Sequence, residues 1–261
     1  MLTVHRLQLL VCCAACALVL AWGSTAHAAA QVSKFNLVLS GNPTTVDAQD
    51  FNEKVIKRFN SLVLEPRGLE GLDNITFAWL YDAQMRYFVR QNFALEAGVG
   101  QLRANSKRQF QPAIGMAIDY RAEVLSVPVH VGGAYYMPAY NQGDFQARWY
   151  LGGGISSLVY NRARFMAVEA GTDSARSLGG DYKLSARRDS PGFYLETGVH
   201  MFFGGRYSVL LGGEYRSSVV RQALGEYETK RASGTVRTPL GPVFDIDTSG
   251  FGGKLALAIG L

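Results

Sequence analysis

Charged residues and cysteines are scarce in this chain, and their scarcity excludes several classes of protein. Asp, Glu, Lys and Arg make up 18% of the 261 residues, below the roughly 25% usual in soluble domains. All three cysteines lie between Cys12 and Cys16, which leaves no disulfide framework and no thiolate chemistry for the rest of the chain. The sequence also lacks a nucleophile elbow and a run of basic residues. We therefore expect no catalytic residue, no metal, no cofactor and no nucleic-acid partner.

Long apolar runs are absent after residue 28, where none reaches the ~18 residues typical of a transmembrane helix. Before that point, Arg6 precedes an uncharged apolar run over residues 7–22, and Ala26 and Ala28 occupy the small-residue positions of a cleavage site. This pattern predicts a secretory signal peptide over residues 1–28 and one mature domain over residues 29–261. The alternatives are a transmembrane anchor and a lipoprotein modified at Cys16.

Apolar and polar side chains alternate with a period of two through most of the mature chain. From Phe77 to Val89, aromatic and aliphatic residues occupy the odd positions, while Asp82, Gln84 and Arg86 fall on the even ones. A strand points successive side chains to opposite faces, so this alternation predicts a two-faced strand. The same pattern predicts eight strands, over residues 34–40, 77–90, 93–100, 125–136, 145–156, 193–203, 207–216 and 251–261.

Short and long connections alternate between these predicted strands. The short ones lie near residue 91 and at residues 138–144 and 204–206; the long ones are residues 41–75, 104–118, 164–190 and 222–248. Transmembrane barrels have this asymmetry, with short periplasmic turns and longer extracellular loops. We therefore predict an all-β fold, an eight-stranded antiparallel up-and-down transmembrane β-barrel in the outer membrane. The long segments 164–190 and 222–248 are polar, and we expect mobile, solvent-facing loops there.

The first long connection is predicted to contain one amphipathic helix, over residues 47–64. Phe51, Val55, Ile56, Phe59 and Leu62 fall near helical spacing there. Such a helix either caps the mouth of the barrel or lies on the membrane surface.

The inward faces carry acidic and basic side chains in nearly equal numbers. An eight-stranded barrel is just wide enough to be filled by side chains, and buried charge is tolerated only when paired. We therefore predict a network of salt bridges that plugs the lumen. Its members are Asp82, Arg86, Glu96, Arg148, Glu196, Glu214, Arg216 and Lys254.

Two finer features of the predicted interior leave alternatives open. A three-residue hairpin at residues 204–206 places Glu196 opposite Glu214. The pair belongs to a structural ladder with Arg and Lys, or forms a proton or cation site; a glycosidase-like pair lacks a cleft for sugar. His130 and His200 also point inward, as interior histidines or, less simply, as a metal pair or catalytic base.

The chain resembles the small outer-membrane β-barrel superfamily of OmpA-like and OmpW-like proteins. Residues 122–137, AEVLSVPVHVGGAYYM, resemble a strand with a central proline common in such barrels. Residues 250–261, GFGGKLALAIGL, are similar to the C-terminal strand signal read by the barrel assembly machinery, with Leu261 in place of the usual aromatic residue. The resemblance implies outer-membrane lipid and that machinery as partners.

Four functions fit these predictions. The first is a non-enzymatic envelope protein with a structural or surface-interaction role, which binds a surface ligand through its long loops. The second, implied by the OmpW-like resemblance, is a conduit for small or hydrophobic solutes. The third is a lipid-modifying barrel enzyme, and the fourth is a soluble lipocalin-like barrel with its apolar face inside.

Overall fold

The computed structural model describes residues 33–113, 116–142, 144–170, 181–203, 206–231 and 234–261. The predicted signal peptide at residues 1–28 lies outside this part of the chain. Eleven strands are found in it: β1 (Phe35–Thr45), β2 (Phe77–Arg90), β3 (Phe93–Ala113), β4 (Met116–Tyr136), β5 (Tyr140–Gln142), β6 (Phe145–Ala170), β7 (Asp181–Arg187), β8 (Ser190–Phe202), β9 (Tyr207–Arg231), β10 (Gly234–Asp247) and β11 (Gly250–Gly260).

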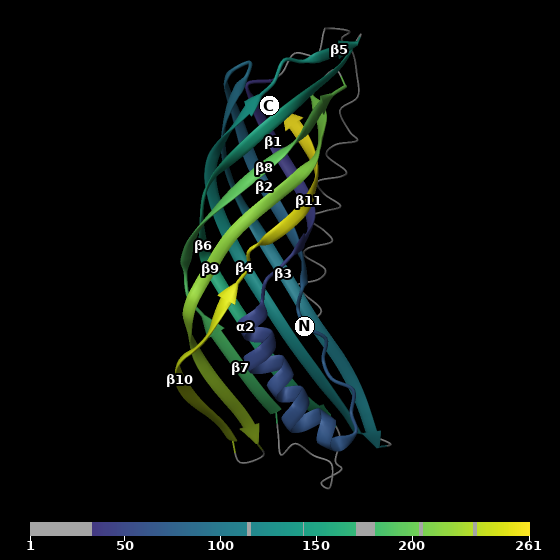
Figure 1. The fold of residues 1–261 in the computed structure, drawn as a ribbon, viewed down its shortest axis with the longest axis vertical. Helices are drawn as coiled ribbons and strands as arrows, with labels where there is room; N and C mark the ends of the chain where they lie inside the picture. The colour runs from purple at the N-terminus through teal and green to yellow at the C-terminus, as the bar shows by residue number, and fades with distance from the viewer. Residues whose placement is uncertain (1–32, 114–115, 143, 171–180, 204–205, 232–233) are drawn as a thin grey trace.

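Antiparallel pairing closes these strands into a barrel-like ring (Figure 1). The ring runs β11–β1–β2–β3–β4–β6–β8–β9 and returns to β11. Beyond the end of β8, the shorter β7 takes its place between β6 and β9. Beyond the end of β11, β10 takes its place beside β9. The prediction of an all-β, antiparallel fold with one helical segment is confirmed.

The prediction of long loops is wrong for most of the described residues between the strands. β3 and β4 continue to Ala113 and Met116, β6 continues to Ala170, and β9 reaches Arg231. β7 and β10 fill further parts of the predicted loops at 164–190 and 222–248. Beyond the predicted strands, the further parts of β3, β4, β6 and β9 together with β7 and β10 form an antiparallel sheet in the order β3–β4–β6–β7–β9–β10, which we call the strand extension; among the described residues its outer strands β3 and β10 do not pair with each other.

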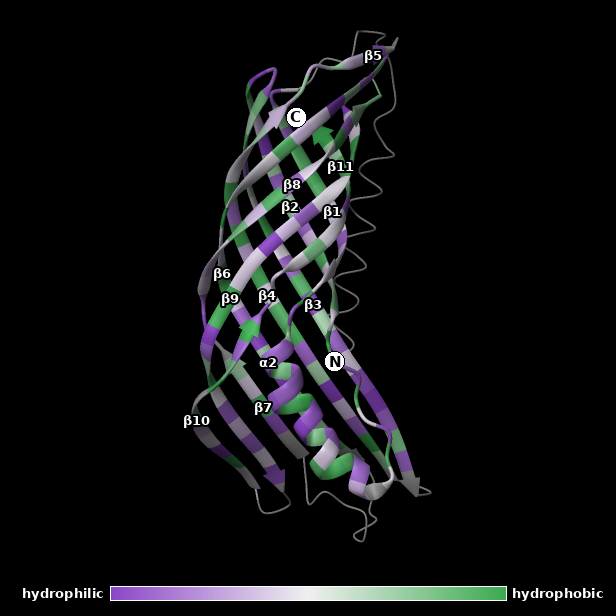
Figure 2. Cartoon of the chain, in the orientation of Figure 1, coloured by the Kyte–Doolittle hydropathy of each residue, from purple (hydrophilic) through white to green (hydrophobic). Residues whose placement is uncertain are grey.

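Hydrophobic and hydrophilic residues alternate along the strands in both halves of the molecule (Figure 2). The reason for this error is that the face on which the apolar residues lie reverses along strands that enter the strand extension, as β4 shows. Near the short turns of β4, Val129 and Val131 face outward while His130 faces the interior. In the strand extension, Tyr120 and Val124 are buried inside. The prediction assumed that apolar residues of a membrane strand face outward, which holds near the short turns but not in the strand extension.

Apolar side chains cover the outside of the ring between the short turns and the strand extension. Trp79 and Trp149 are 45% and 59% exposed. Other exposed members of this outward band are Phe77, Tyr81, Leu95, Val99, Val131, Leu151, Ile155, Phe193, Leu195, Leu211, Phe251 and Leu255. The lipocalin-like alternative, with its apolar face inside, is therefore wrong.

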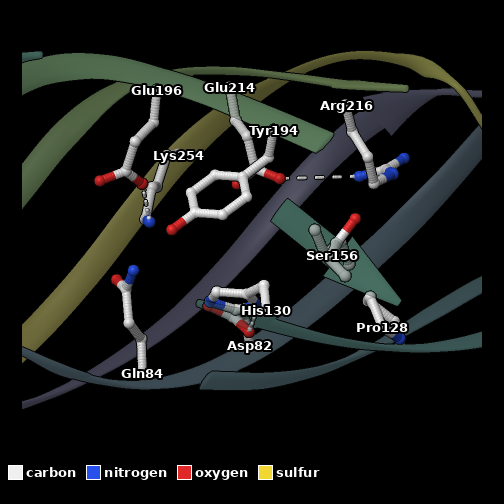
Figure 3. A pocket seen from close by; sticks show the side chains of 11 residues that line it. Asp82, Gln84, Pro128, His130, Ser156, Tyr194, Glu196, Glu214, Arg216 and Lys254 are labelled. Carbon is white, nitrogen blue, oxygen red and sulfur yellow. Dashed lines mark hydrogen bonds and ion pairs between the residues drawn. The ribbon is translucent and has the colours of Figure 1, made fainter. Parts of the chain in front are cut away.

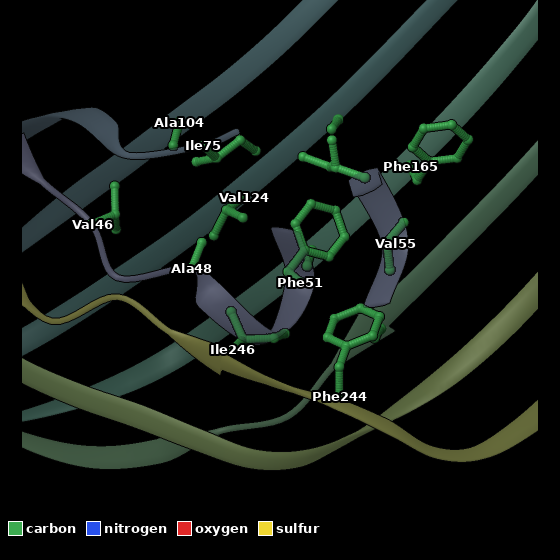
Figure 4. Packing of buried hydrophobic residues seen from close by; sticks show 14 of the residues in the cluster. Val46, Ala48, Phe51, Val55, Ile75, Ala104, Val124, Phe165, Phe244 and Ile246 are labelled. Atoms are coloured by element: carbon green, nitrogen blue, oxygen red, sulfur yellow. The ribbon is translucent and has the colours of Figure 1, made fainter. Parts of the chain in front are cut away.

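A helical segment over residues 49–67 fills the inside of the strand extension (Figure 4). It consists of α2 (Gln49–Phe51), two π-helical stretches at Asn52–Lys57 and Asn60–Leu64, and a 3-10 turn at Glu65–Arg67. Phe51 packs on Phe244 of β10, with ring centroids 5.2 Å apart. Phe59 packs on Tyr120 of β4 and Phe165 of β6, at 5.2 and 4.5 Å.

This segment, which we call the plug helix, has a slightly different buried face from the predicted one. Leu62 is 63% exposed, whereas Leu64 is fully buried. The helix ends at Gly68, whose φ of 68° is left-handed and favours glycine.

Two asparagines of the plug helix hold the connection that leads back to β2. Asn52 donates from Nδ2 to the Ile75 carbonyl at 2.9 Å and accepts from the Ile75 amide at 2.8 Å. Asn60 makes the same pair of bonds with Leu72, at 3.0 and 2.9 Å. These side-chain amides satisfy the backbone N–H and C=O groups of Ile75 and Leu72, as a neighbouring strand would. The plug helix is therefore held by hydrogen bonds to this connection as well as by its apolar face.

Candidate functional site

Four charged side chains from four strands meet inside the ring. Arg86 of β2 contacts Glu96 of β3, with 2.9 Å between Nε and Oε1. Arg86 also donates from Nη2 to Glu196 of β8, and Lys254 of β11 donates to the other oxygen of that carboxylate. None of the four side chains is more than 2% exposed. Two positive and two negative charges balance, as burial of charge requires. We call these four residues the central cluster.

Three tyrosines surround the central cluster, and sequence reasoning did not select them. Tyr136 accepts a hydrogen bond from Nη1 of Arg86 at 2.7 Å. The guanidinium carbon of Arg86 lies 4.8 Å from the centre of the Tyr150 ring. Tyr194 donates to Oε2 of Glu96 at 3.3 Å. Their even, inward positions on β4, β6 and β8 could have predicted this, because an inward tyrosine places its hydroxyl next to the buried charges.

A second, looser group of charges lies toward the strand extension. The register pairs Glu196 directly with Glu214 of β9, as the hairpin arithmetic predicts. Glu214 turns toward Arg216, at 3.8 Å, and accepts a hydrogen bond from Asn42 at 3.4 Å (Figure 3). The two facing carboxylates thus have different cations, which relieves their repulsion.

Between these two groups lies a cavity of about 20 Å³, room for one water molecule. Asp82 and His130 lie together on one wall, with 3.8 Å between Oδ1 and Nδ1 (Figure 3). Gln84 and Ser156 each have a buried polar atom without a hydrogen-bond partner among the described residues. The space is far too small for a solute to pass.

Arg148 lies away from the cluster, toward the short turns, whereas His200 adjoins it through Tyr136, with 3.3 Å between Nδ1 and the hydroxyl. Arg148 donates to the Gln91 carbonyl and lines an open mouth of about 630 Å³. His200 is fully buried and contacts Ser208, with 2.7 Å between Nε2 and Oγ. Ser208 is 2% exposed, so both residues of this contact are buried.

Interior glycines provide the space that the long side chains occupy. A Cβ on Gly98 would lie 2.6 Å from Nε2 of His130, and one on Gly152 would lie 3.1 Å from Cγ of Glu196. Both distances are shorter than ordinary van der Waals contacts. The cluster therefore depends on the missing side chains of the facing strands.

Two further findings concern the described part of the chain. It holds no group of three or more His, Cys, Asp or Glu side chains that could bind a metal ion. It also contains no helix that is long and apolar enough to cross a membrane.

Comparisons with known proteins point to one family. The family model described as "outer membrane protein beta-barrel domain" matches residues 14–236. No curated protein matches the chain. Similar solved structures include the outer membrane protein OprG from Pseudomonas aeruginosa, with 15% identity, 89% of this chain and 98% of that chain covered, and a TM-score of 0.44.

Two more solved structures have a similar degree of likeness. One is a major outer membrane protein from Thermus thermophilus, with 10% identity, coverage of 86% and 98%, and a TM-score of 0.46. The other is Ail from Yersinia pestis in complex with the heparin analogue sucrose octasulfate, with 12% identity, coverage of 88% and 98%, and a TM-score of 0.38.

Proposed function

Because the chain belongs to the outer membrane protein beta-barrel family, we propose that it is a non-enzymatic, non-conducting barrel with a structural or surface-interaction role. Its ring of eight antiparallel strands crosses the outer membrane. The short turns face the periplasm, and the strand extension stands outside the cell. The outward apolar band supports the membrane crossing, because its side chains require lipid around them, and the asymmetry between short turns at one end and the strand extension at the other supports the orientation.

The observation that carries the proposal is the central cluster. Arg86, Glu196 and Lys254 come from different strands and join across the lumen through buried contacts. An ion that passed would have to break contacts between buried charges, which is costly. The plug helix closes the extracellular end of the same path with apolar contacts.

Ion conductance in a planar bilayer tests the proposed plug. We expect the reconstituted protein to give no stable single-channel current at any applied voltage that the bilayer tolerates. A heat-modifiable gel shift confirms that the same preparation is folded. Stable, reproducible channels from folded protein would refute the plugged lumen.

A second candidate is a conduit for hydrophobic solutes, and one observation favours it. The inner wall of the strand extension is apolar and rich in small residues such as Ala104, Ala122, Ala163 and Ala167. The space they leave is filled by the plug helix. Helix displacement would uncover an apolar chamber. Uptake of an apolar dye into proteoliposomes tests this: faster uptake by Phe51→Ala than by wild type supports the conduit, and equal uptake rejects it.

A further inference from the structure

The outer face of β3, β4 and β6 carries a cluster of cations just beyond the outward apolar band. The cluster consists of Arg103, Lys107, Arg121, Arg162 and Arg164, with the carboxylates Glu123 and, at its outer edge, Asp119 on the same face. We call it the basic wall patch. Outward parity follows from Trp79, which is exposed and pairs with Arg103, and from the buried inward neighbours Ala122 and Val124.

The patch carries an excess of positive charge that the described residues do not neutralise. Glu123 contacts Arg103 at 3.2 Å and Arg164 at 3.0 Å. It is 8% exposed because these two arginines cover it on the outer face. Five cations and two carboxylates leave a net charge of +3.

Two of these cations face one another in the sheet. Lys107 is paired directly with Arg121, and neither forms an ion pair within the part of the chain that the structure describes. Like charges directly opposite each other destabilise a sheet. An anion between them would turn that cost into an attraction.

The height of the patch tells which anion it would meet. Arg103 lies ten residues along β3 from Phe93, which flanks a short turn. At about 3.3 Å per residue and a tilt of ~40°, that length spans about 25 Å across the membrane, the usual height of the lipid-facing band. Arg103 therefore lies at the level of the outer headgroups.

The basic wall patch adjoins an apolar strip of the outer face, so a lipid would find cations for its headgroup next to an apolar surface for its acyl chains. Directly below the patch, Val99 and Val129 are 49% and 39% exposed and face outward, as acyl chains require. The guanidinium of Arg162 lies 5.7 Å from the ring of Tyr160, which holds it along the wall. A free anion would use only the cations, whereas a lipid also uses the apolar strip beneath them.

We propose that the basic wall patch binds the phosphorylated headgroup of an outer-leaflet glycolipid, with the acyl chains along β3 and β4. Arg103 and Arg164, fixed by Glu123, flank one side of the headgroup. Lys107 and Arg121 close on a phosphate from the other. The site is separate from the lumen and does not depend on whether the lumen conducts.

Native mass spectrometry of the folded protein in detergent, titrated with bisphosphorylated lipid A, tests the site. Each cation near an anionic lipid surface contributes about 1 kcal/mol. Lys107→Gln with Arg121→Gln should therefore weaken binding about 30-fold. The double variant should melt no lower than wild type, because it removes a like-charge pair. Arg162→Gln, a milder change, should weaken binding about fivefold.

The control removes the same charge elsewhere. Lys57→Gln with Arg58→Gln changes two exposed cations of the plug helix and should bind lipid A as wild type does. Fully dephosphorylated lipid A should bind at least tenfold more weakly. The proposal fails if the wall variants keep wild-type affinity, if the control loses as much as they do, or if phosphate groups make no difference. Displacement of lipid A by equimolar inorganic phosphate would show a soluble-anion site and also overturn it.

Discussion

Replacement of Glu196 by glutamine is the most direct test of how the interior is held together. The carboxylate receives Arg86 on one oxygen and Lys254 on the other, and is about 1% exposed. Its loss leaves one uncompensated positive charge in the central cluster. Removal of one partner from a buried ion pair costs about 3–5 kcal/mol. We therefore expect Glu196→Gln to lower the folded-to-unfolded ratio about a thousandfold, measured by urea titration with the heat-modifiable gel shift.

Two further variants separate charge balance from general damage. Glu214→Gln neutralises the facing carboxylate, whose cation Arg216 is 3.8 Å away, and should cost less than half as much. Glu196→Gln with Lys254→Met removes one charge of each sign and should recover much of the lost stability, because the remaining Arg86 and Glu96 balance. Equal losses for Glu196→Gln and Glu214→Gln, or no recovery in the double variant, would refute the balanced-cluster argument.

Three other outcomes are expected. Gly98→Ala places a Cβ 2.6 Å from a buried imidazole nitrogen and should destabilise the barrel by about 1–3 kcal/mol in the same titration, whereas Gly253→Ala, 4.0 Å from its nearest neighbour, should be nearly neutral. Phe51→Ala should cost about 3–5 kcal/mol and expose the plug helix to protease, unlike Leu62→Ala on the exposed face. Burial would raise the pKa of Asp50, but hydrogen bonds from Lys54 and from the Asp245 amide outweigh burial and lower the pKa. Protection of the plug helix from hydrogen exchange should therefore be full above the ordinary carboxyl pKa and should fall as the pH drops below it. Asp50→Asn should remove this pH dependence.

The membrane half of the molecule was predictable from the sequence because one rule governs it. Lipid outside and charge inside give an alternation that shows the strands, the short turns and the inward parity of Glu196 and Lys254. The family and outer-membrane localisation predicted on this basis are confirmed. Which cation pairs with which carboxylate was not predictable, because parity does not fix the reach of a side chain across the lumen. Arg148 shows this: it shares the inward parity but bonds at the mouth.

The strand extension was missed because its environment reverses. In the proposed orientation, a strand that leaves lipid has water outside and the plug helix inside, so apolar residues change faces. Tyr120 and His130 lie on the same inward face of β4, one in an apolar core and one beside charges. When apolar residues are expected only on the outer face, the strand extension of such a strand looks like a polar loop.

The reversal also shows where the molecule meets its surroundings. On the outer wall, apolar side chains give way to cations between Val99 and Arg103 on β3. On the inner wall of β4, the charged lumen gives way to an apolar core between His130 and Val124. In the proposed orientation, both transitions fall near the outer edge of the lipid, because a strand that leaves the membrane loses its lipid outside and gains the plug helix inside. In this orientation, the outer wall of β3 and the inner wall of β4 therefore mark the level of the outer headgroups independently of each other.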